Sequence, residues 1–359
     1  MRIKIFILSL CAILFTGAGC INIGGKETGP MGVYRSLDKG DTWEAVTAFP
    51  TPQGVKSIAG LKIFRIFEDP SDSNAFYLGT RGQGLFYTYD NGDSWQEVKF
   101  FSGKFIYALA VDPKDKCVIY ASDGPNIYKT TDCSRSWSLV FTETRTNERF
   151  VSIAIDNSGA RTVYGAQLNG DLLASKDEGK TWQTVKRFNF QLQQLEVDHK
   201  VPGRLYTASY RKGLYRSDDG GKNWITLNEE LKKFSNDAFN FYRLVLNTAQ
   251  KDSLFWISKY GILRSDNAGQ TWTELKLLTP PGAVTILAFD INEKNPKEIY
   301  YTGSQLGDKN AHLRSTFYKS SDGGVKWETK KLPTNTLPVM IKVNAKNDSS
   351  ILMGFTVLN

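Results

Sequence analysis

One eight-residue motif recurs seven times along this chain and constrains its fold more than any other feature. The motif, which we call the box, reads Ser/Thr-x-Asp-x-Gly-x-x-Trp, and it accounts for seven of the eight tryptophans. Ser134 replaces the glycine in the third copy, and Asn267 replaces the aspartate in the sixth. The paired acidic (or amide) and aromatic residues of the seven boxes are Asp38 and Trp43, Asp90 and Trp95, Asp132 and Trp137, Asp177 and Trp182, Asp219 and Trp224, Asn267 and Trp272, and Asp322 and Trp327.

Each residue type in the box suits a tight turn between two strands. The Asp side chain can accept hydrogen bonds from backbone N–H groups, and Gly supplies the positive φ that closes the turn. The Trp then starts the next strand and buries a large ring. Calcium binding is the alternative for runs such as Ser217 to Gly220, but most copies offer one or two carboxylates and lack the terminal Glu of calcium loops. We therefore predict structural boxes, with no metal site and no cofactor.

The spacing of the boxes predicts a propeller. Successive box tryptophans are 52, 42, 45, 42, 48 and 55 residues apart, close to the period of roughly 40–50 residues that propeller blades show. Four strand-like pieces recur in each period, and the second carries an aromatic residue at a fixed place: Tyr77, Tyr120, Tyr164, Tyr206, Trp256 and Tyr301. The first piece ends in an acid or amide: Asp69, Asp112, Asp156, Asp198, Asn247, Asp290 and Asn344. The predicted fold is an all-β, seven-bladed propeller of four-stranded antiparallel blades.

The ends of the repeat region predict how the ring closes. Gly32 to Arg35 reads as a third strand that leads into the first box, without the two strands that should precede it. Met340 to Asn344 and Ile351 to Gly354 read as a first and a second strand without the two that should follow. Joined, these pieces make one blade shared between the two ends of the domain 32–359, and a closed ring leaves no open sheet edge.

The first 31 residues read as an export signal and a tether. Arg2 and Lys4 precede an apolar run and the sequence Gly17-Ala18-Gly19-Cys20, which is the layout of a secretory signal. This end resembles a bacterial lipobox, although Gly17 stands where Leu is usual. We expect a signal peptide over 1–19, a lipidated Cys20 and a flexible tether over 20–31, and hence an exported, membrane-anchored lipoprotein facing the periplasm or the cell surface. Plain secretion is the alternative.

The net charge of the chain gives no indication of nucleic-acid binding. Without residues 1–19, which hold Arg2 and Lys4 and no acid, the net charge falls from +8 to +6. This is mildly basic, and no nucleic-acid motif is present.

Cys117 and Cys133 belong to one hairpin whose turn centres on Pro125, so they should lie opposite each other. A disulfide is expected in an exported protein, with two free buried thiols as the alternative.

The box series resembles the Asp-box (BNR) propeller superfamily over the whole stretch from Gly32 to Asn359. That superfamily includes sialidases, two-propeller xyloglucanases, the sortilin luminal domain and the photosystem II assembly factor family, whose single seven-bladed propellers are closest in architecture. The resemblance implies a non-catalytic propeller that binds a protein or peptide partner as a scaffold or assembly factor. A glycan-directed protein, either a hydrolase or a lectin, is the second hypothesis, and a structural surface-layer component is the third.

Catalytic signatures are weak. The segment Phe64-Arg65-Ile66-Phe67 is similar to the start of the sialidase Arg-Ile-Pro motif but lacks the proline. The two histidines, His199 and His312, fall in predicted loops, and neither has a Cys or His neighbour at metal-ligand spacing. Paired carboxylates for glycoside hydrolysis stay open. We predict no catalytic residues, and a glycoside hydrolase if the protein is an enzyme.

The propeller pattern also predicts a binding face. First strands start on the face that carries the loops between second and third strands, which we call the box-free face; the boxes lie on the opposite, box face. Counting four residues back from each strand-ending acid or amide gives positions near the central channel: Arg65, Ala108, Ser152, Gln194, Arg243, Ile286 and Met340. Loops on this face add Arg81, Arg145, Arg149, Tyr210, Arg211, Lys212, Lys259 and Tyr260. Such residues suit a carboxylate-bearing peptide or an anionic glycan. The alternative is ordinary solvated charge, with Arg65 and Arg243 neutralised by Glu68 or Glu196.

Overall fold

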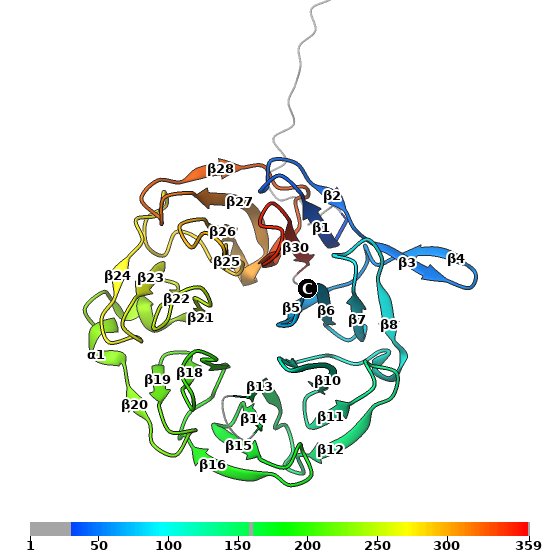
Figure 1. The fold of residues 1–359 in the computed structure, drawn as a ribbon. Helices are drawn as coiled ribbons and strands as arrows, with labels where there is room; N and C mark the ends of the chain where they lie inside the picture. Colours follow the sequence, from blue (N-terminus) through cyan, green and yellow to red (C-terminus); the bar gives the residue numbers. More distant parts are fainter. Residues whose placement is uncertain (1–29, 158–160, 358–359) are drawn as a thin grey trace, which may run out of the picture.

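The computed structural model describes residues 30–157 and 161–357, so the predicted signal peptide, Cys20 and most of the tether lie outside the described residues. Seven four-stranded antiparallel sheets stand side by side in a ring (Figure 1). This confirms the predicted all-β, seven-bladed propeller. None of the helices in the described part of the chain is long and apolar enough to cross a bilayer.

Six blades are built from four consecutive strands each, ordered from the ring centre outwards. They comprise β5 (Ile63–Asp69), β6 (Asp72–Thr80), β7 (Leu85–Thr88) and β8 (Gln96–Val98); β9 (Ala108–Asp112), β10 (Asp115–Ser122), β11 (Asn126–Thr130) and β12 (Ser138–Thr142); β13 (Phe150–Asp156), β14 (Thr162–Gln167), β15 (Asp171–Ser175) and β16 (Gln183–Arg187); β17 (Gln194–Val197), β18 (Leu205–Ser209), β19 (Gly213–Ser217) and β20 (Ile225–Thr226); β21 (Phe241–Leu246), β22 (Leu254–Ser258), β23 (Ile262–Ser265) and β24 (Thr273–Glu274); and β25 (Phe289–Ile291), β26 (Ile299–Leu306), β27 (His312–Ser320) and β28 (Glu328–Lys330).

The seventh blade joins the two ends of the domain, as predicted. Its order is β2 (Glu44–Ala45), β1 (Gly32–Ser36), β30 (Ile351–Thr356) and β29 (Leu337–Val343). Strand β1 pairs with β30 over five residues, from Gly32 opposite Phe355 to Ser36 opposite Ile351. Hydrogen bonds between the two ends of the domain therefore close the ring.

All seven boxes form the same turn. The Ser or Thr hydroxyl oxygen at position one accepts the N–H of position five at 2.7 to 3.2 Å. The Asp or Asn oxygen at position three accepts the N–H of position seven at 2.8 to 2.9 Å. Positions four and five both have positive φ in every copy, including Cys133 and Ser134 in the third. The sequence indicated this backbone conformation only at the glycine.

Packing between neighbouring blades forms the core. In four blades the predicted second-strand aromatic residue faces the next blade; Tyr77, for example, packs with Leu109 and Ile119. The prediction was wrong by one residue for Trp256 and Tyr301, which pack against the preceding blade, and Phe255 and Tyr300 take the predicted place.

Trp95 is fully buried and donates its indole N–H to the Val46 carbonyl at 2.8 Å. The box tryptophans directly precede the fourth strands, and four of them, including Trp43 and Trp137, are only partly buried. The repeat thus supplies one aromatic contact after another around the ring.

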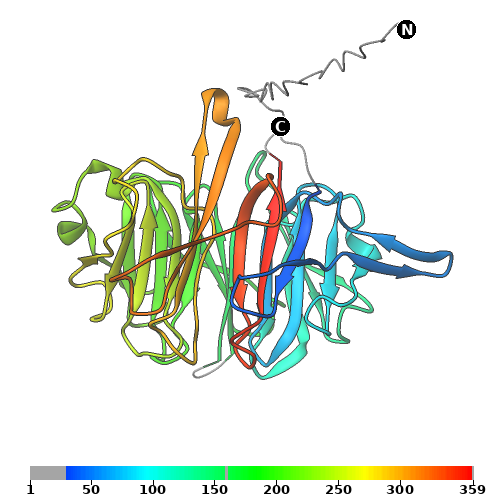
Figure 2. The same ribbon diagram turned by 90° about the horizontal axis from the view of Figure 1, so that it is seen from above.

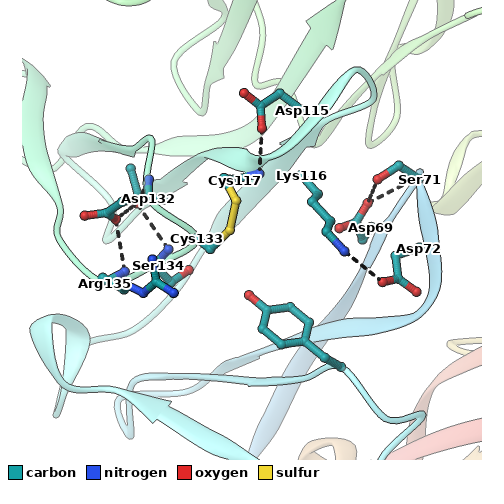
Figure 3. The surroundings of a disulfide bond; sticks show 12 residues. Asp69, Ser71, Asp72, Asp115, Lys116, Cys117, Asp132, Cys133, Ser134 and Arg135 are labelled. Carbon is teal, nitrogen blue, oxygen red and sulfur yellow. Dashed lines mark hydrogen bonds and ion pairs between the residues drawn. A yellow bond between two sulfur atoms is a disulfide. The ribbon is translucent and has the colours of Figure 1, made fainter.

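Cys117 and Cys133 are joined by a disulfide that ties β10 to the third box turn (Figure 3). The strands pair Ser122 with Ile127, so the hairpin is centred one half-residue before Pro125. The two cysteines are therefore offset slightly from direct opposition, and the Cys133 N–H donates to the Cys117 carbonyl at 3.3 Å. The bond links a buried second strand to the turn that the third strand enters.

Three insertions interrupt the repeat. A ribbon of β3 (Ala48–Thr51) and β4 (Gly54–Ser57) projects from the rim, and the β26–β27 hairpin rises above the box-free face (Figure 2). Short helices, α1 (Asn228–Leu231) and η2 (Asn236–Phe239), follow β20; η1 (Lys99–Phe101) and η3 (Asp308–Asn310) are further single turns. His312 lies in the extended β27 and is buried, so its placement in an exposed loop was wrong, because this hairpin is longer than those of the other blades.

Candidate binding site on the box-free face

Side chains of the first strands line the ring centre in two layers. In six blades the predicted acid or amide ends the first strand or directly follows it, and five of these residues cap the following turn, as Asp69 does by accepting the Ser71 N–H at 2.8 Å. In the β25 blade the residue in this role is Asn292, which accepts the Lys294 N–H at 2.9 Å, and not Asp290. The predicted channel position Ile286 is therefore two residues off, and Ala288 takes its place. Asp290 thus belongs to the second layer, beside Glu196 and Lys342.

Three of the predicted arginines lie over two aromatic rings near the start of β5. Arg65 and Arg81 each lie over the Phe64 ring, at 5.2 and 5.3 Å from its centroid. Arg149 lies over Tyr107 at 5.4 Å. We call these residues, together with Phe105, the arginine–aromatic cluster.

The rings of this cluster are packed on one another and only partly buried. Phe105 stacks on Tyr107 at 4.1 Å between centroids, and Phe64 meets Phe105 edge-on at 4.9 Å. Within the described residues, no carboxylate oxygen lies within 4.0 Å of Arg65, Arg81 or Arg149. Their positive charges are balanced by aromatic faces rather than by ion pairs, which leaves the guanidinium edges available to a ligand.

Arg65 and Arg243 point into the ring centre from opposite sides. Arg65 donates to the Val151 carbonyl at 3.2 Å, and Arg243 contacts Met340 Sδ at 2.8 Å. Burial lowers the pKa of Arg65, and burial together with the neighbouring Arg65 charge lowers the pKa of Arg243 to about 10. Both stay protonated at neutral pH. Glu68, one of the two acids expected to neutralise them, is paired with Lys342 at 2.8 Å instead.

Gln194 occupies the same layer but is already engaged. Its Nε2 donates to the Leu244 carbonyl at 2.8 Å and to Glu196 at 2.6 Å, and its Oε1 accepts the Leu244 N–H at 3.0 Å. The side chain therefore joins β17 to β21. Gln194 orients Glu196 in the channel rather than offering a free amide to a ligand.

Towards the box face the channel carries a mixed-charge layer. Lys342 pairs with Glu68, and Asp290 accepts the Val343 N–H at 2.8 Å. Burial raises the pKa of Asp290 to about 6, Lys342 opposes this, and Glu68 adds to it; burial likewise raises the pKa of Glu196. Sequence reasoning took Asp290 for a repeated structural acid. The missed signal was that the same position holds Phe67, Ala110 or Val245 in other blades.

The remaining predicted residues fall into two groups. Arg145 pairs with Glu143 at 2.7 Å and Asp171 at 2.8 Å, so its charge is neutralised in place. The second group is Tyr210, Arg211, Lys212, Lys259 and Tyr260. Of these, Arg211 and Lys212 line a groove of about 850 Å³ together with residues of the inserted helices.

Backbone contacts hold this groove together. The N–H of Arg211 donates to the Phe239 carbonyl at 2.7 Å, and the N–H of Tyr260 to the Asp237 carbonyl at 3.2 Å. The Lys259 ammonium pairs with Asp237 at 3.2 Å. The insertion after β20 thus links the loops of two blades. Phe239 and Asn240 are lining residues that the sequence did not indicate, because they come from an insertion rather than from the repeat.

The described residues contain no group of three or more His, Cys, Asp or Glu side chains arranged to hold a metal ion. The carboxylate oxygens of the box aspartates accept hydrogen bonds within their own turns. Hydrogen bonds from the seventh box residue lower the pKa to about 2 in four of them: Asp38, Asp132, Asp177 and Asp219. Seven repeated carboxylates or amides are thus accounted for by folding.

Comparisons with known proteins agree with this architecture. The chain is 30% identical over 158 residues to xyloglucanase Xgh74A of Acetivibrio thermocellus, covering 43% of the chain and 16% of that protein. It is 29% identical over 155 residues to the photosystem II assembly lipoprotein Ycf48 of Prochlorococcus marinus, covering 42% of the chain and 41% of that protein. The aligned stretches therefore span less than half of either relative.

Solved structures show the same fold at low identity. A GH74 enzyme of Niastella koreensis superposes with a TM-score of 0.64 at 16% identity, covering 90% of this chain and 53% of that one. A structure described as YCF48 bound to D1 peptide superposes with a TM-score of 0.59 at 19% identity, covering 82% of this chain and 94% of that one. The sequence profile described as sortilin, neurotensin receptor 3, matches residues 31–167 and 212–354. With that match over most of its length, and with boxes in every blade, the chain belongs to the sortilin (Vps10) family of propellers.

Proposed function

We propose that this protein is an exported, non-catalytic propeller that binds a protein or peptide through its box-free face and acts as a scaffold or assembly factor. The observation that carries the proposal is the arginine–aromatic cluster, in which Arg65, Arg81 and Arg149 lie on aromatic rings and have no carboxylate partner within the described residues. A protein that needed these arginines only for folding would pair them, as it pairs Arg145.

The chemistry of this face favours an acidic peptide with aromatic or apolar side chains. A free guanidinium edge can bind a carboxylate through two parallel hydrogen bonds, and partly exposed rings add contact area at little entropic cost. Arg65 and Arg243 continue the positive surface into the channel mouth. The relative whose structure is described as bound to a D1 peptide supports a peptide as the class of partner.

The expected lipid anchor would orient this face. Strand β1 starts at Gly32 on the box-free face, so a tether that precedes β1 would join the ring on that face. The 11 residues from Cys20 to Pro30 reach at most roughly 40 Å when fully extended. With Cys20 lipidated, the arginine–aromatic cluster would face the membrane, where a membrane-embedded partner presents its ends and loops.

A direct test uses the soluble domain from Lys26 onward and short peptides graded from acidic to basic, with binding followed by fluorescence anisotropy. Arg81→Ala combined with Arg149→Ala should weaken binding of acidic, aromatic-containing peptides at least ~10-fold, or about 1.4 kcal/mol. The control is Arg135→Ala, which removes an exposed arginine from a box turn on the opposite face. Equal binding by the folded double variant and the control would discard the site.

A glycan-directed activity is the second candidate, favoured by the xyloglucanase relative and by the channel carboxyls Glu68, Glu196 and Asp290. A carboxyl with a raised pKa beside an ionised one is the pairing that glycoside hydrolysis uses. Incubation with xyloglucan oligosaccharides separates the two candidates. Turnover that disappears in Glu196→Gln would favour the enzyme over the scaffold.

A further inference from the structure

The third box, which runs from Thr130 to Trp137, departs from the other six at position five, where they all carry glycine. Ser134 holds this place with a φ of 70°, whereas the six glycines have φ values of 83° to 93°. A residue with a Cβ adopts this left-handed conformation at a cost that glycine does not have. At position five, the sequence of the third box therefore disfavours the closed turn.

Core side chains also enclose position five. In the other six boxes a Cβ at the glycine would lie 2.3 to 3.4 Å from a side-chain carbon. Ser134 brings both a Cβ and a hydroxyl to this place, and its buried hydroxyl has no hydrogen-bond partner among the described residues. A buried hydroxyl without a partner destabilises the closed turn further.

Two hydrogen bonds that hold the turn are longer in the third box than elsewhere. The Ser134 N–H reaches the Thr130 hydroxyl oxygen at 3.2 Å, against 2.7 to 3.0 Å for the equivalent glycines. The Cys133 N–H reaches the Cys117 carbonyl oxygen at 3.3 Å, against 2.7 to 3.0 Å at the same position of five other boxes. Hydrogen bonds thus support the closed turn less well here.

The preceding blade supports the fourth box in a way that the third box lacks. Tyr120 donates its hydroxyl to the Glu178 carbonyl, at position four of the fourth box, at 2.9 Å. Tyr77, the equivalent residue in the blade before the third box, shares a hydrogen bond with the Tyr89 hydroxyl at 3.3 Å instead. The Cys133 carbonyl accepts no side-chain hydrogen bond within the described ranges 30–157 and 161–357. The fourth box is therefore a matched reference for the third.

A covalent bond holds the third box. Cys133, at position four, is bonded to Cys117 in β10, and both cysteines are only partly buried (Figure 3). A small dithiol can therefore reach the sulfurs. Its thiolate attacks one sulfur to give a mixed disulfide, and its second thiol then releases that cysteine. The reductant becomes a disulfide, and Cys117 and Cys133 become thiols.

We propose that the third box is a redox-sensitive turn. While the Cys117–Cys133 bond is intact, it keeps the turn closed in place of the missing glycine. Once a dithiol reduces the bond, the turn opens and the other six boxes stay closed. Opening releases Trp137, which packs edge-on against Phe101 with 4.8 Å between ring centroids. The turn lies on the box face, so the proposal does not depend on the function proposed for the opposite face.

Trypsin cleavage under native conditions tests the proposal, because Arg135 and Lys180 are exposed at position six of the third and fourth boxes. The chain from Lys26 onward, which contains every described strand, is compared with and without dithiothreitol, and cleavage after each residue is followed by mass spectrometry. We expect reduction to speed cleavage after Arg135 at least ~10-fold and to leave cleavage after Lys180 unchanged.

Ser134→Gly separates the effect of the missing glycine from that of the disulfide. After reduction, this variant should be cleaved after Arg135 at least ~10-fold more slowly than the reduced parent, because glycine favours the closed turn. Cys117→Ser combined with Cys133→Ser should be cleaved rapidly with or without dithiothreitol. The parent folds before it is reduced, so the main comparison does not depend on whether the cysteine variant folds.

Three results would overturn the proposal. The first is cleavage after Arg135 that does not change on reduction. The second is equal acceleration after Arg135 and Lys180, which would mean that the whole ring opens and not one turn. The third is equally fast cleavage of the reduced parent and reduced Ser134→Gly, which would mean that the serine does not weaken the turn.

Discussion

The two faces of the ring are made from the same strands but use their polar groups differently. On the box face, seven copies of one turn satisfy their own hydroxyls, carboxylates and N–H groups, and the pKa values of four box aspartates fall to about 2. On the box-free face and in the channel, residues differ from blade to blade. There, burial lowers the pKa of Arg243 to about 10 and raises that of Asp290 to about 6.

This difference distinguishes residues that fold the ring from residues that are available for binding. Residues that recur in every blade form hydrogen bonds within their own turn, so their polar groups are not available to a ligand. Residues that break the repeat, such as Arg65 and Arg243 among first strands, leave groups with uncommon partners or none. In a repeat protein, departure from the repeat is therefore a better guide to function than residue type alone.

The largest expected effect concerns the ring that both faces share. Deleting residues 350–359 removes β30, which pairs with β1 on one side and β29 on the other. The seventh blade then cannot form, and we expect loss of cooperative unfolding, measured by calorimetry and urea denaturation. Removing residues 51–54 from the tip of the β3–β4 ribbon should leave the transition intact. A truncated protein that melts like the parent would contradict the shared blade.

The pH dependence of stability should distinguish the channel from the boxes. Asp290 binds a proton more tightly in the folded protein, where its pKa is about 6, than in the unfolded chain, where it is about 4. The free energy of unfolding should therefore fall as pH rises from about 4 to about 6, by up to about 3 kcal/mol. The box aspartates act in the opposite sense: their stabilisation is complete above about pH 4 and is lost as pH falls towards about 2.

Denaturation curves at a series of pH values check both slopes. Asp290→Asn should flatten the dependence between about pH 4 and 6 and leave the acid limb unchanged. Asp177→Asn should alter only the acid limb. If Asp290→Asn preserves the slope in the upper window, the assignment of that slope to the channel is wrong.

A smaller effect is expected from a single box hydroxyl. Ser217 is 1% exposed, accepts the Gly221 N–H at 2.9 Å and donates to Asp219 at 2.8 Å. Ser217→Ala leaves the buried N–H without a partner and should cost about 2 kcal/mol in urea denaturation. Ser138→Ala, on an exposed outer strand, is the matched control and should have almost no effect. Equal stability of the two variants would mean that the box hydroxyls do not stabilise the turn.

The smallest effect should come from the binding face. Arg81 is exposed, lies over Phe64 and has no ion pair within the described residues. Arg81→Ala should change the free energy of unfolding by less than about 0.5 kcal/mol, even though it belongs to the proposed binding site. A loss comparable to that of Ser217→Ala would mean that the cluster is part of the folding scaffold, which would break the contrast between the faces.

Most of the fold was predictable because the repeat encodes it locally. The residues of the box predict the turn, the spacing of the boxes predicts the four-stranded blade, and the incomplete repeats at the two ends of the domain predict the shared blade. The insertions were not predictable: the β3–β4 ribbon and the extended β26–β27 hairpin appear in the sequence only as longer box spacings, which give no shape. The same limitation placed His312 in a loop.

The candidate site was predictable only in part. Topology placed Arg65, Arg81 and Arg149 on one face, but which rings they would contact depends on packing between blades, so Phe64, Phe105 and Tyr107 were missed. The pairing of Arg145 with Glu143 and Asp171, and the role of Gln194 in joining two strands, depend on side-chain geometry that no residue pattern encodes.

The position of β1 inside its blade has a mechanical consequence. Because β1 lies between β2 and β30 and is the first strand of the described ring, a pull on the residues that precede β1 would act along the axis of this strand. Force in that direction shears all five residue pairs with β30 together instead of opening them one after another. A load applied to the residues before β1 would thus pass through the β1–β30 pairing that closes the ring, and it would act on that pairing in shear, the direction in which paired strands resist separation best.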